Sequence, residues 1–61
     1  MIYQQSFYYW EISYKNSQHE EIINKTKKFT LRDMESSWIN EEKDYLINKC
    51  ENTPIVKLVK L

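Results

Sequence analysis

The sequence predicts a small α+β domain in which the elements follow the order strand, strand, helix, strand. Three observations predict this fold. Residues 8–15 alternate in polarity, residues 31–51 carry apolar residues at helical spacing, and residues 55–61 are rich in β-branched types. The 61-residue chain contains no linker or low-complexity stretch, so we expect one domain over residues 1–61. Its small three-stranded sheet should pack on one long or interrupted helix.

Residues 8–15 are predicted to form the first strand because aromatic and β-branched residues favour strands. The alternation divides the strand into two faces: Tyr8, Trp10, Ile12 and Tyr14 on one, and Tyr9, Glu11, Ser13 and Lys15 on the other. A helical stripe of Tyr3, Phe7, Trp10 and Tyr14 competes with this interpretation. We expect the strand.

The polar residues 16–19 predict a hairpin loop, and residues 20–29 predict a second strand with lysines suited to a sheet edge. Thr30 with Asp33 forms a capping-box pattern that begins a helix reaching about Glu51. Its predicted core stripe is Leu31, Met34, Trp38, Tyr45 and Leu46. Either this is one interrupted helix, or there are two helices: Ser36-Ser37 and Asn40 leave open a break near Trp38-Ile39, with Asn40 as the cap of the second helix.

The end of the helix is marked by Asn52 and Pro54. Asn52 is predicted to adopt the left-handed conformation after the helix, and Pro54 excludes helical geometry at the residue before it. Residues 55–61 then predict a last strand that returns to the sheet.

The composition argues against an enzyme. The sequence has no glycine, so it lacks phosphate-binding loops and nucleophile elbows, which need a residue free to adopt positive φ. His19 and Cys50 are the single residues of their types, whereas metal sites draw on several such ligands and a His–Cys dyad needs both within hydrogen-bond reach. We therefore expect no catalytic residues, metal, cofactor or small-molecule substrate.

Charge and hydropathy limit the partners and the location. The formal net charge is zero, so no long-range field would gather nucleic acid or an anionic membrane. No run approaches the roughly 18 apolar residues of a membrane span, and the start does not resemble a secretory signal. With a single cysteine, these features predict a cytoplasmic protein with no membrane partner.

The aromatic residues are the most informative feature, because six of the nine fall within the first fourteen residues. One helix covers only one face of a small sheet, so we expect some of these rings to face outward and bind a partner. Alternatively, the rings or residues 1–6 cover that face themselves. The predicted partner is a larger protein or a second copy of the chain, with acidic helix residues supplying rim charge. The predicted binding residues are Tyr3, Phe7, Tyr9, Glu41 and Glu42.

Nucleic-acid binding is the alternative. The run 10–15, a hairpin loop, Lys27-Lys28-Phe29-Thr30 and a helical segment ending in Trp38 resemble the arm-type DNA-binding domain of phage integrases over residues 8–38. That family also has a sheet followed by a helix. The resemblance implies DNA contacts by Trp10, Tyr14, Lys25, Lys27 and Lys28, to which the basic run adds Arg32.

A composition heavy in Lys, Asn, Ile and Glu is typical of AT-rich bacterial or phage genomes. Phage chains of this size often inhibit host or defence proteins. The sequence-based hypothesis is therefore a small stoichiometric inhibitor or accessory protein, of the anti-CRISPR kind, that covers a functional surface of its target.

Overall fold

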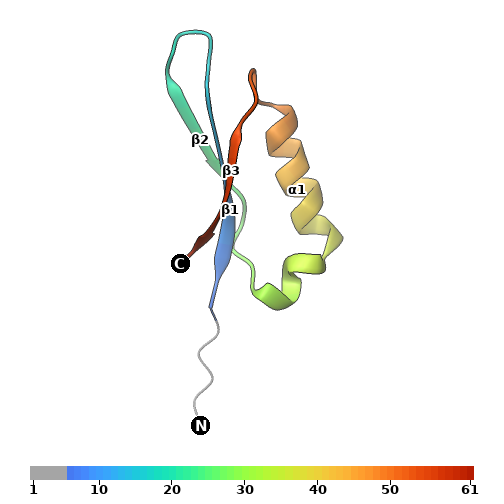
Figure 1. The fold of residues 1–61 in the computed structure, drawn as a ribbon. Coiled ribbons are helices and arrows are strands. Elements are labelled where there is room, and N and C mark those ends of the chain that lie inside the picture. Colours follow the sequence, from blue (N-terminus) through green and yellow to red (C-terminus); the bar gives the residue numbers. More distant parts are fainter. Residues whose placement is uncertain (1–5) are drawn as a thin grey trace.

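The computed structural model describes residues 6–61 and shows a three-stranded antiparallel sheet with a helix on one side of it (Figure 1). The elements in chain order are β1 (Tyr8–Lys15), β2 (Glu21–Lys25), the 3-10 helix η1 (Leu31–Glu35), α1 (Ser37–Asn48) and β3 (Ile55–Lys60). This order confirms the predicted α+β fold.

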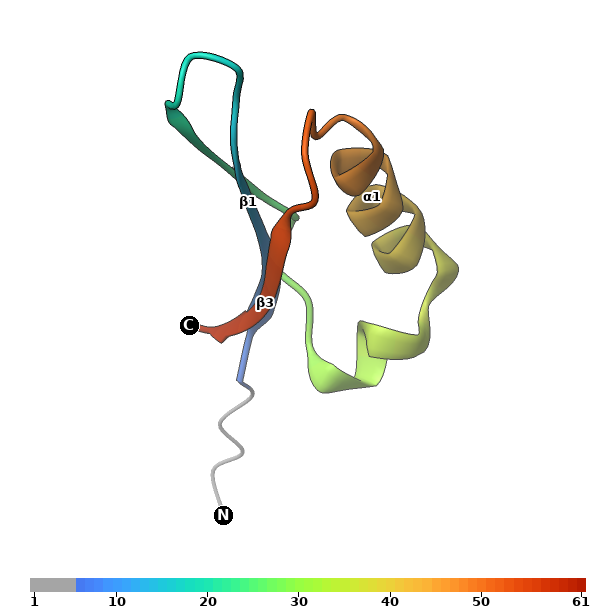
Figure 2. The same ribbon diagram turned by 45° about the horizontal axis from the view of Figure 1, so that its top comes forward.

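Strand β1 lies at the centre of the sheet, because the strand order is β2-β1-β3 and both neighbours are antiparallel to it. Its bounds are those predicted from the alternation. The face that carries Ile12 is turned toward α1, and Figure 2 shows α1 as a separate layer beside the sheet. Ile12, Phe29 and Ile39 are the fully buried side chains among residues 6–61. Ile12 comes from the central strand β1 and Ile39 from α1. Phe29 comes from the connector, which we define as residues 26–30 between β2 and η1.

The hairpin between β1 and β2 is built on Asn16. Its Oδ1 accepts hydrogen bonds from the backbone N–H groups of Gln18 and Glu20 at 3.0 and 2.9 Å. Its own N–H donates to the carbonyl of Glu20, and its carbonyl accepts from the N–H of His19. Asn side chains stabilise turns in this way. The predicted loop is thus confirmed.

His19 occupies the left-handed region with φ of 62°, a conformation that normally favours glycine. We expect His19→Gly to raise the free energy of unfolding by about 0.5–1 kcal/mol, because relief of backbone strain outweighs the extra entropy of the unfolded chain. Urea denaturation of both proteins measures this change. Gln18→Gly is the matched control, because Gln18 has no positive φ. This variant should lower the free energy of unfolding by a similar amount. A loss of stability in both variants would contradict the strain argument.

The second strand is shorter than the predicted 20–29 segment, because pairing with β1 stops at Lys25. Thr26 replaces the next ladder position with its side chain: Oγ1 accepts from the Trp10 N–H at 2.9 Å, and the Thr26 N–H donates to the Trp10 carbonyl at 3.0 Å. The chain then rejoins β1 at one bridge, where Phe29 and Tyr8 exchange two backbone hydrogen bonds of 2.8 Å. This bridge holds Phe29 on the face of the sheet that is turned toward α1.

The helical segment is interrupted at Ser36, one of the two serines at which the sequence left a break open, and two residues before the expected place at Trp38. Asp33 Oδ2 accepts from the Thr30 hydroxyl at 2.9 Å, so the predicted capping pair is present, but it caps the 3-10 helix η1. Ser36 is extended and separates η1 from α1. The predicted break near Trp38 with Asn40 as a cap is wrong, because Asn40 lies inside α1.

This extended residue also changes which side of α1 meets the sheet. The half-buried and buried positions of α1 recur at helical spacing, and they are Ile39, Glu42, Lys43, Leu46 and Ile47. The predicted core stripe is wrong for Leu31, Trp38 and Tyr45, which are all exposed. A stripe counted continuously from Leu31 loses its phase where the backbone of Ser36 leaves the helix.

The segment after α1 ties the helix to the hairpin. Asn52 Nδ2 donates to the carbonyl of Lys15 at 2.6 Å, and Glu51 Oε2 accepts from the N–H of Ser17 at 2.8 Å. The prediction of a left-handed Asn52 is wrong, since His19 is the one positive-φ residue among residues 6–61. The predicted last strand is confirmed by β3, which pairs with β1 over its whole length.

Candidate interaction surface

The sheet has one face that no helix among residues 6–61 covers, and we call it the open face. Opposed residues of antiparallel strands point to the same side, so the register of β1 with β2 and β3 defines this face. It consists of the odd-numbered residues of the three strands, together with Phe7 and Leu61. The Leu61 N–H donates to the Phe7 carbonyl. Its members are Phe7, Tyr9, Glu11, Ser13, Lys15, Glu21, Ile23, Lys25, Ile55, Lys57, Val59 and Leu61.

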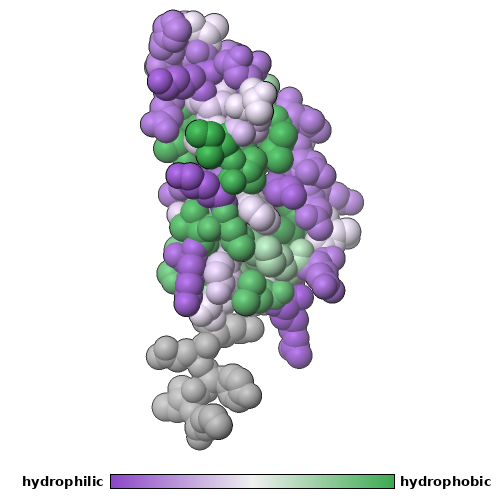
Figure 3. Space-filling model, viewed as in Figure 1, coloured by the Kyte–Doolittle hydropathy of each residue, from purple (hydrophilic) through white to green (hydrophobic). Residues whose placement is uncertain are grey.

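Apolar side chains on the open face remain in contact with solvent. The exposed fractions are 43% for Phe7, 49% for Ile23, 61% for Ile55 and 63% for Leu61. Figure 3 shows apolar side chains gathered over the sheet, while hydrophilic side chains cover the helix and the hairpin tip. Exposed apolar residues that come from several strands and share one face indicate an interaction surface.

Charged residues divide this face into two apolar parts. Glu11 lies between Lys25 and Lys57 in the register, and these three residues form a row across the sheet. On one side of the row, Tyr9 is opposite Val59, next to Phe7 and Leu61. On the other side, Ser13 lies between Ile23 and Ile55. The Lys25 ammonium lies 5.3 Å from the centre of the Tyr9 ring, within cation–π range.

The predicted partner-binding residues are only partly brought together. Phe7 and Tyr9 both lie on the open face, and Tyr3 lies outside the described residues. Glu41 is exposed on α1, on the other side of the sheet. Glu42 is half-buried, and its Oε1 accepts the N–H of Lys27 at 3.1 Å. The acidic pair therefore does not border the aromatic pair, and charge on the open face comes from strand residues instead.

The residues expected to contact nucleic acid are spread over three regions. Lys25 is on the open face, whereas Trp10 and Tyr14 belong to the face turned toward α1. The Lys43 ammonium lies 5.1 Å from the Trp10 ring, so a helix residue covers that indole. The exposed side chains of Lys27, Lys28 and Arg32 lie on the connector and on η1.

Sequence reasoning missed the aliphatic half of the open face, which is Ile23, Ile55, Val59 and Leu61. Their odd numbering in strands of predicted alternation was a usable signal. It was not sufficient, because the sequence does not show which parity of one strand lies opposite which parity of another.

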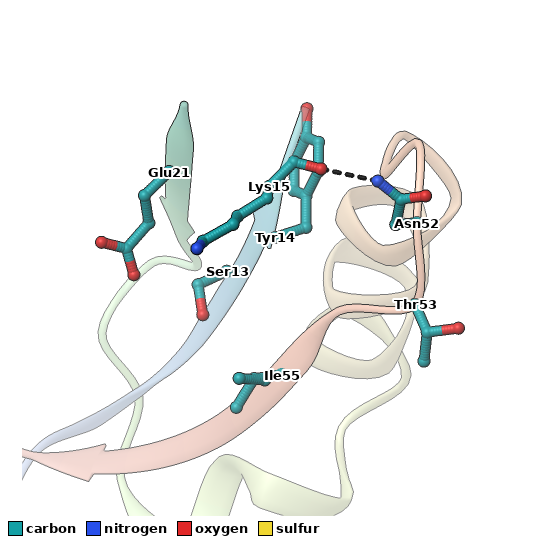
Figure 4. Close-up of a pocket in the computed structure, with 7 residues that line it drawn as sticks. All are labelled: Ser13, Tyr14, Lys15, Glu21, Asn52, Thr53 and Ile55. Atoms are coloured by element: carbon teal, nitrogen blue, oxygen red, sulfur yellow. Dashed lines mark hydrogen bonds between the residues drawn. The ribbon is translucent and has the colours of Figure 1, made fainter. Parts of the chain in front are cut away.

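An open groove of about 310 Å³ lies at the hairpin end of the sheet. Figure 4 shows its lining, with the hydrogen bond from Asn52 to the Lys15 carbonyl at one side. Ser13, Lys15, Glu21 and Ile55 connect the groove to the open face. Within residues 6–61, no group of three His, Cys, Asp or Glu residues is placed to hold a metal ion.

In the part of the chain that the structure describes, no helix has the length and apolar character needed to cross a membrane. Comparison of the chain with protein-family models, curated proteins and solved structures finds no match.

Proposed function

We propose that this chain is a small non-enzymatic protein-binding module whose open face docks on a larger protein. The observation that supports this proposal is the set of open-face apolar side chains that are exposed among residues 6–61. Ile23 comes from β2 and Ile55 from β3, while Phe7 and Leu61 lie just beyond the ends of β1 and β3. Burying such side chains against a partner is favourable at about 25 cal/mol per Å². Aromatic residues near the centre of an interface often contribute most of its binding energy. Tyr9 and Phe7 are the aromatic residues of this face.

The charged row supplies orientation to such a complex. Lys25, Glu11 and Lys57 cross the sheet between the two apolar parts. A partner that offers acidic groups opposite the lysines and a donor opposite Glu11 would match this pattern, whereas a partner shifted along the sheet would place like charges together. The row therefore favours one register of docking over its neighbours.

The module acts by covering a functional surface of its target. A chain of 61 residues has room for one small core and gains its effect from the area that it occupies. The composition, heavy in Lys, Asn, Ile and Glu, supports a phage or mobile-element origin, a role as a stoichiometric inhibitor or accessory protein, and a location in the cytoplasm of a bacterial host. Nucleic-acid binding through the basic residues is the competing outcome of the test below.

The test compares Tyr9→Ala and Phe7→Ala with the control Tyr45→Ala, which removes an exposed tyrosine from α1. Each protein is immobilised, and bacterial lysate is passed over it with and without nuclease. A retained protein is then purified, and its affinity for each variant is measured by calorimetry. We expect Tyr9→Ala and Phe7→Ala to weaken binding at least about 30-fold, as for central aromatic residues, and Tyr45→Ala to have little effect.

Equal affinity of the open-face variants and the Tyr45→Ala control would exclude the open face as the docking surface. Recovery of nucleic acid, or loss of the retained material with nuclease and with added salt, would instead support the nucleic-acid alternative. In that case substitution of Lys27 and Lys28 should weaken binding more than substitution of Tyr9. Circular dichroism of each variant checks that the fold is retained.

A further inference from the structure

The outer edge of β3 has backbone groups without partners among residues 6–61. In an antiparallel ladder, alternate residues of a strand bond to the neighbour on one side. The Leu61 N–H donates to the Phe7 carbonyl, so the odd-numbered residues of β3 bond to β1. The N–H and C=O groups of Val56, Leu58 and Lys60 therefore point to the free edge. Within the described chain, β1 is the one strand that pairs with β3.

This edge also has apolar side chains on both of its faces. Val56 and Leu58, on the side of α1, are 37% and 39% exposed. Ile55, on the open face, is 61% exposed. The strand contains no proline and no bulge over the six residues Ile55–Lys60. Proteins commonly block a free edge with proline, a bulge or charged side chains. The edge strand β3 has Lys57 and Lys60 but neither a proline nor a bulge, so its backbone groups remain accessible to another strand that is not positively charged opposite these lysines.

We propose that a second copy of the chain pairs with this edge, with β3 antiparallel to the β3 of its partner about a two-fold axis at Leu58. The strand order across the pair is then β2-β1-β3-β3-β1-β2. In this register Leu58 lies opposite Leu58 of the second copy, and Val56 lies opposite Lys60. These are the residues whose backbone groups face the free edge, so the pair forms about six backbone hydrogen bonds.

Charge and hydrogen bonding favour this register over its neighbours. With the axis at Lys57, the Lys57 side chains of the two copies would be directly opposite each other, which is unfavourable. That register would also leave the Lys60 backbone without a partner. With the axis at Val59, Val56 would lie beyond Lys60, at which β3 of the second copy ends. The register at Leu58 uses all the free groups of β3 and places no lysine opposite a lysine.

A second copy suits the edge because the strand is complementary to itself. The edge interface is isologous, as two-fold symmetry requires, and the formal net charge of zero means that two copies do not repel each other at long range. Pairing also places the two open faces side by side on one continuous sheet. The inference does not depend on the proposed function, since it concerns the edge of β3 and not the open face.

The test measures the mass of the full chain by analytical ultracentrifugation from low micromolar to millimolar concentration. We expect the 7.6 kDa monomer to double in mass as the concentration rises, because so small an interface binds weakly. Leu58→Lys and Leu58→Glu each place like charges on the axis and should stay monomeric. Their equimolar mixture places opposite charges on the axis and should regain the dimer. That recovery would also show that both variants are folded.

The control Ile23→Lys changes an exposed residue of β2, the strand at the other edge, and should dimerise like the original chain. Amide hydrogen exchange by NMR supplies a second readout. The amides of Val56, Leu58 and Lys60 should become protected as the concentration rises, and should stay unprotected in Leu58→Lys. A monomer at every concentration, or fast exchange of these three amides at millimolar concentration, would overturn the proposal. Tyr9→Ala should leave the mass unchanged, so this proposal and the proposed function can fail separately.

Discussion

Phe29→Ala is expected to lower the free energy of unfolding by about 3–5 kcal/mol, the range for removal of a buried phenylalanine ring. Phe29 is 1% exposed and is held at the β1 bridge by two backbone hydrogen bonds of 2.8 Å. Removal of the ring therefore leaves a cavity, and the cavity cannot close because these hydrogen bonds fix the surrounding backbone. Because a domain of this size is rarely stabilised by more than about 3–5 kcal/mol, most of the variant should be unfolded at 25 °C.

The matched control is Phe7→Ala, which also removes a phenylalanine ring, but from the open face. Phe7 is 43% exposed, and we expect its loss to cost about 1 kcal/mol or less. Urea denaturation followed by circular dichroism gives both values. If Phe7→Ala destabilised the chain as much as Phe29→Ala, the open face would be part of the core, and the proposed docking surface would not exist.

Ile39→Ala should have the second largest effect, a loss of about 2–4 kcal/mol. Ile39 is the fully buried residue of α1, so its side chain holds the helix on the sheet. Tyr45→Ala is the control, because Tyr45 is 59% exposed and its ring lies 4.4 Å from the Lys49 ammonium on the outer side of the helix. We expect this variant to lose less than about 1 kcal/mol.

The comparison of these two variants tests the rotation of α1 about its axis. The stripe counted from Leu31 places Tyr45 in the core, whereas the structure places Ile39 there. A larger loss for Tyr45→Ala than for Ile39→Ala in urea denaturation would support the orientation inferred from the sequence and contradict the structure.

Local pattern was sufficient for the bounds of β1, for its division into two faces and for the presence, though not the length, of β2. The alternation over residues 8–15 predicted both the bounds of β1 and the outward position of Tyr9. Period-two alternation is a property of the extended backbone itself, so it needs no knowledge of neighbouring strands. The turn at Asn16 and the last strand were also predicted from local information, because the residue types that favour them act over only a few positions.

The orientation of the helix required the tertiary structure. One extended residue at Ser36 breaks the helical count, and residue types do not fix such a break, because serine is compatible with a cap or with a helix interior. Residue types also do not show that the Thr26 side chain takes the place of a backbone acceptor in the ladder. Its hydroxyl accepts a hydrogen bond only because Trp10 lies opposite, sixteen positions away in the chain.

By itself, the sequence determined that this chain is a small α+β domain with an aromatic first strand and one face of that strand turned outward. Only the tertiary structure decided the strand order, the aliphatic residues that complete the open face and the free edge of β3. The physical reason is that alternation determines which residues of one strand share a side, whereas the register between strands depends on contacts between distant parts of the chain.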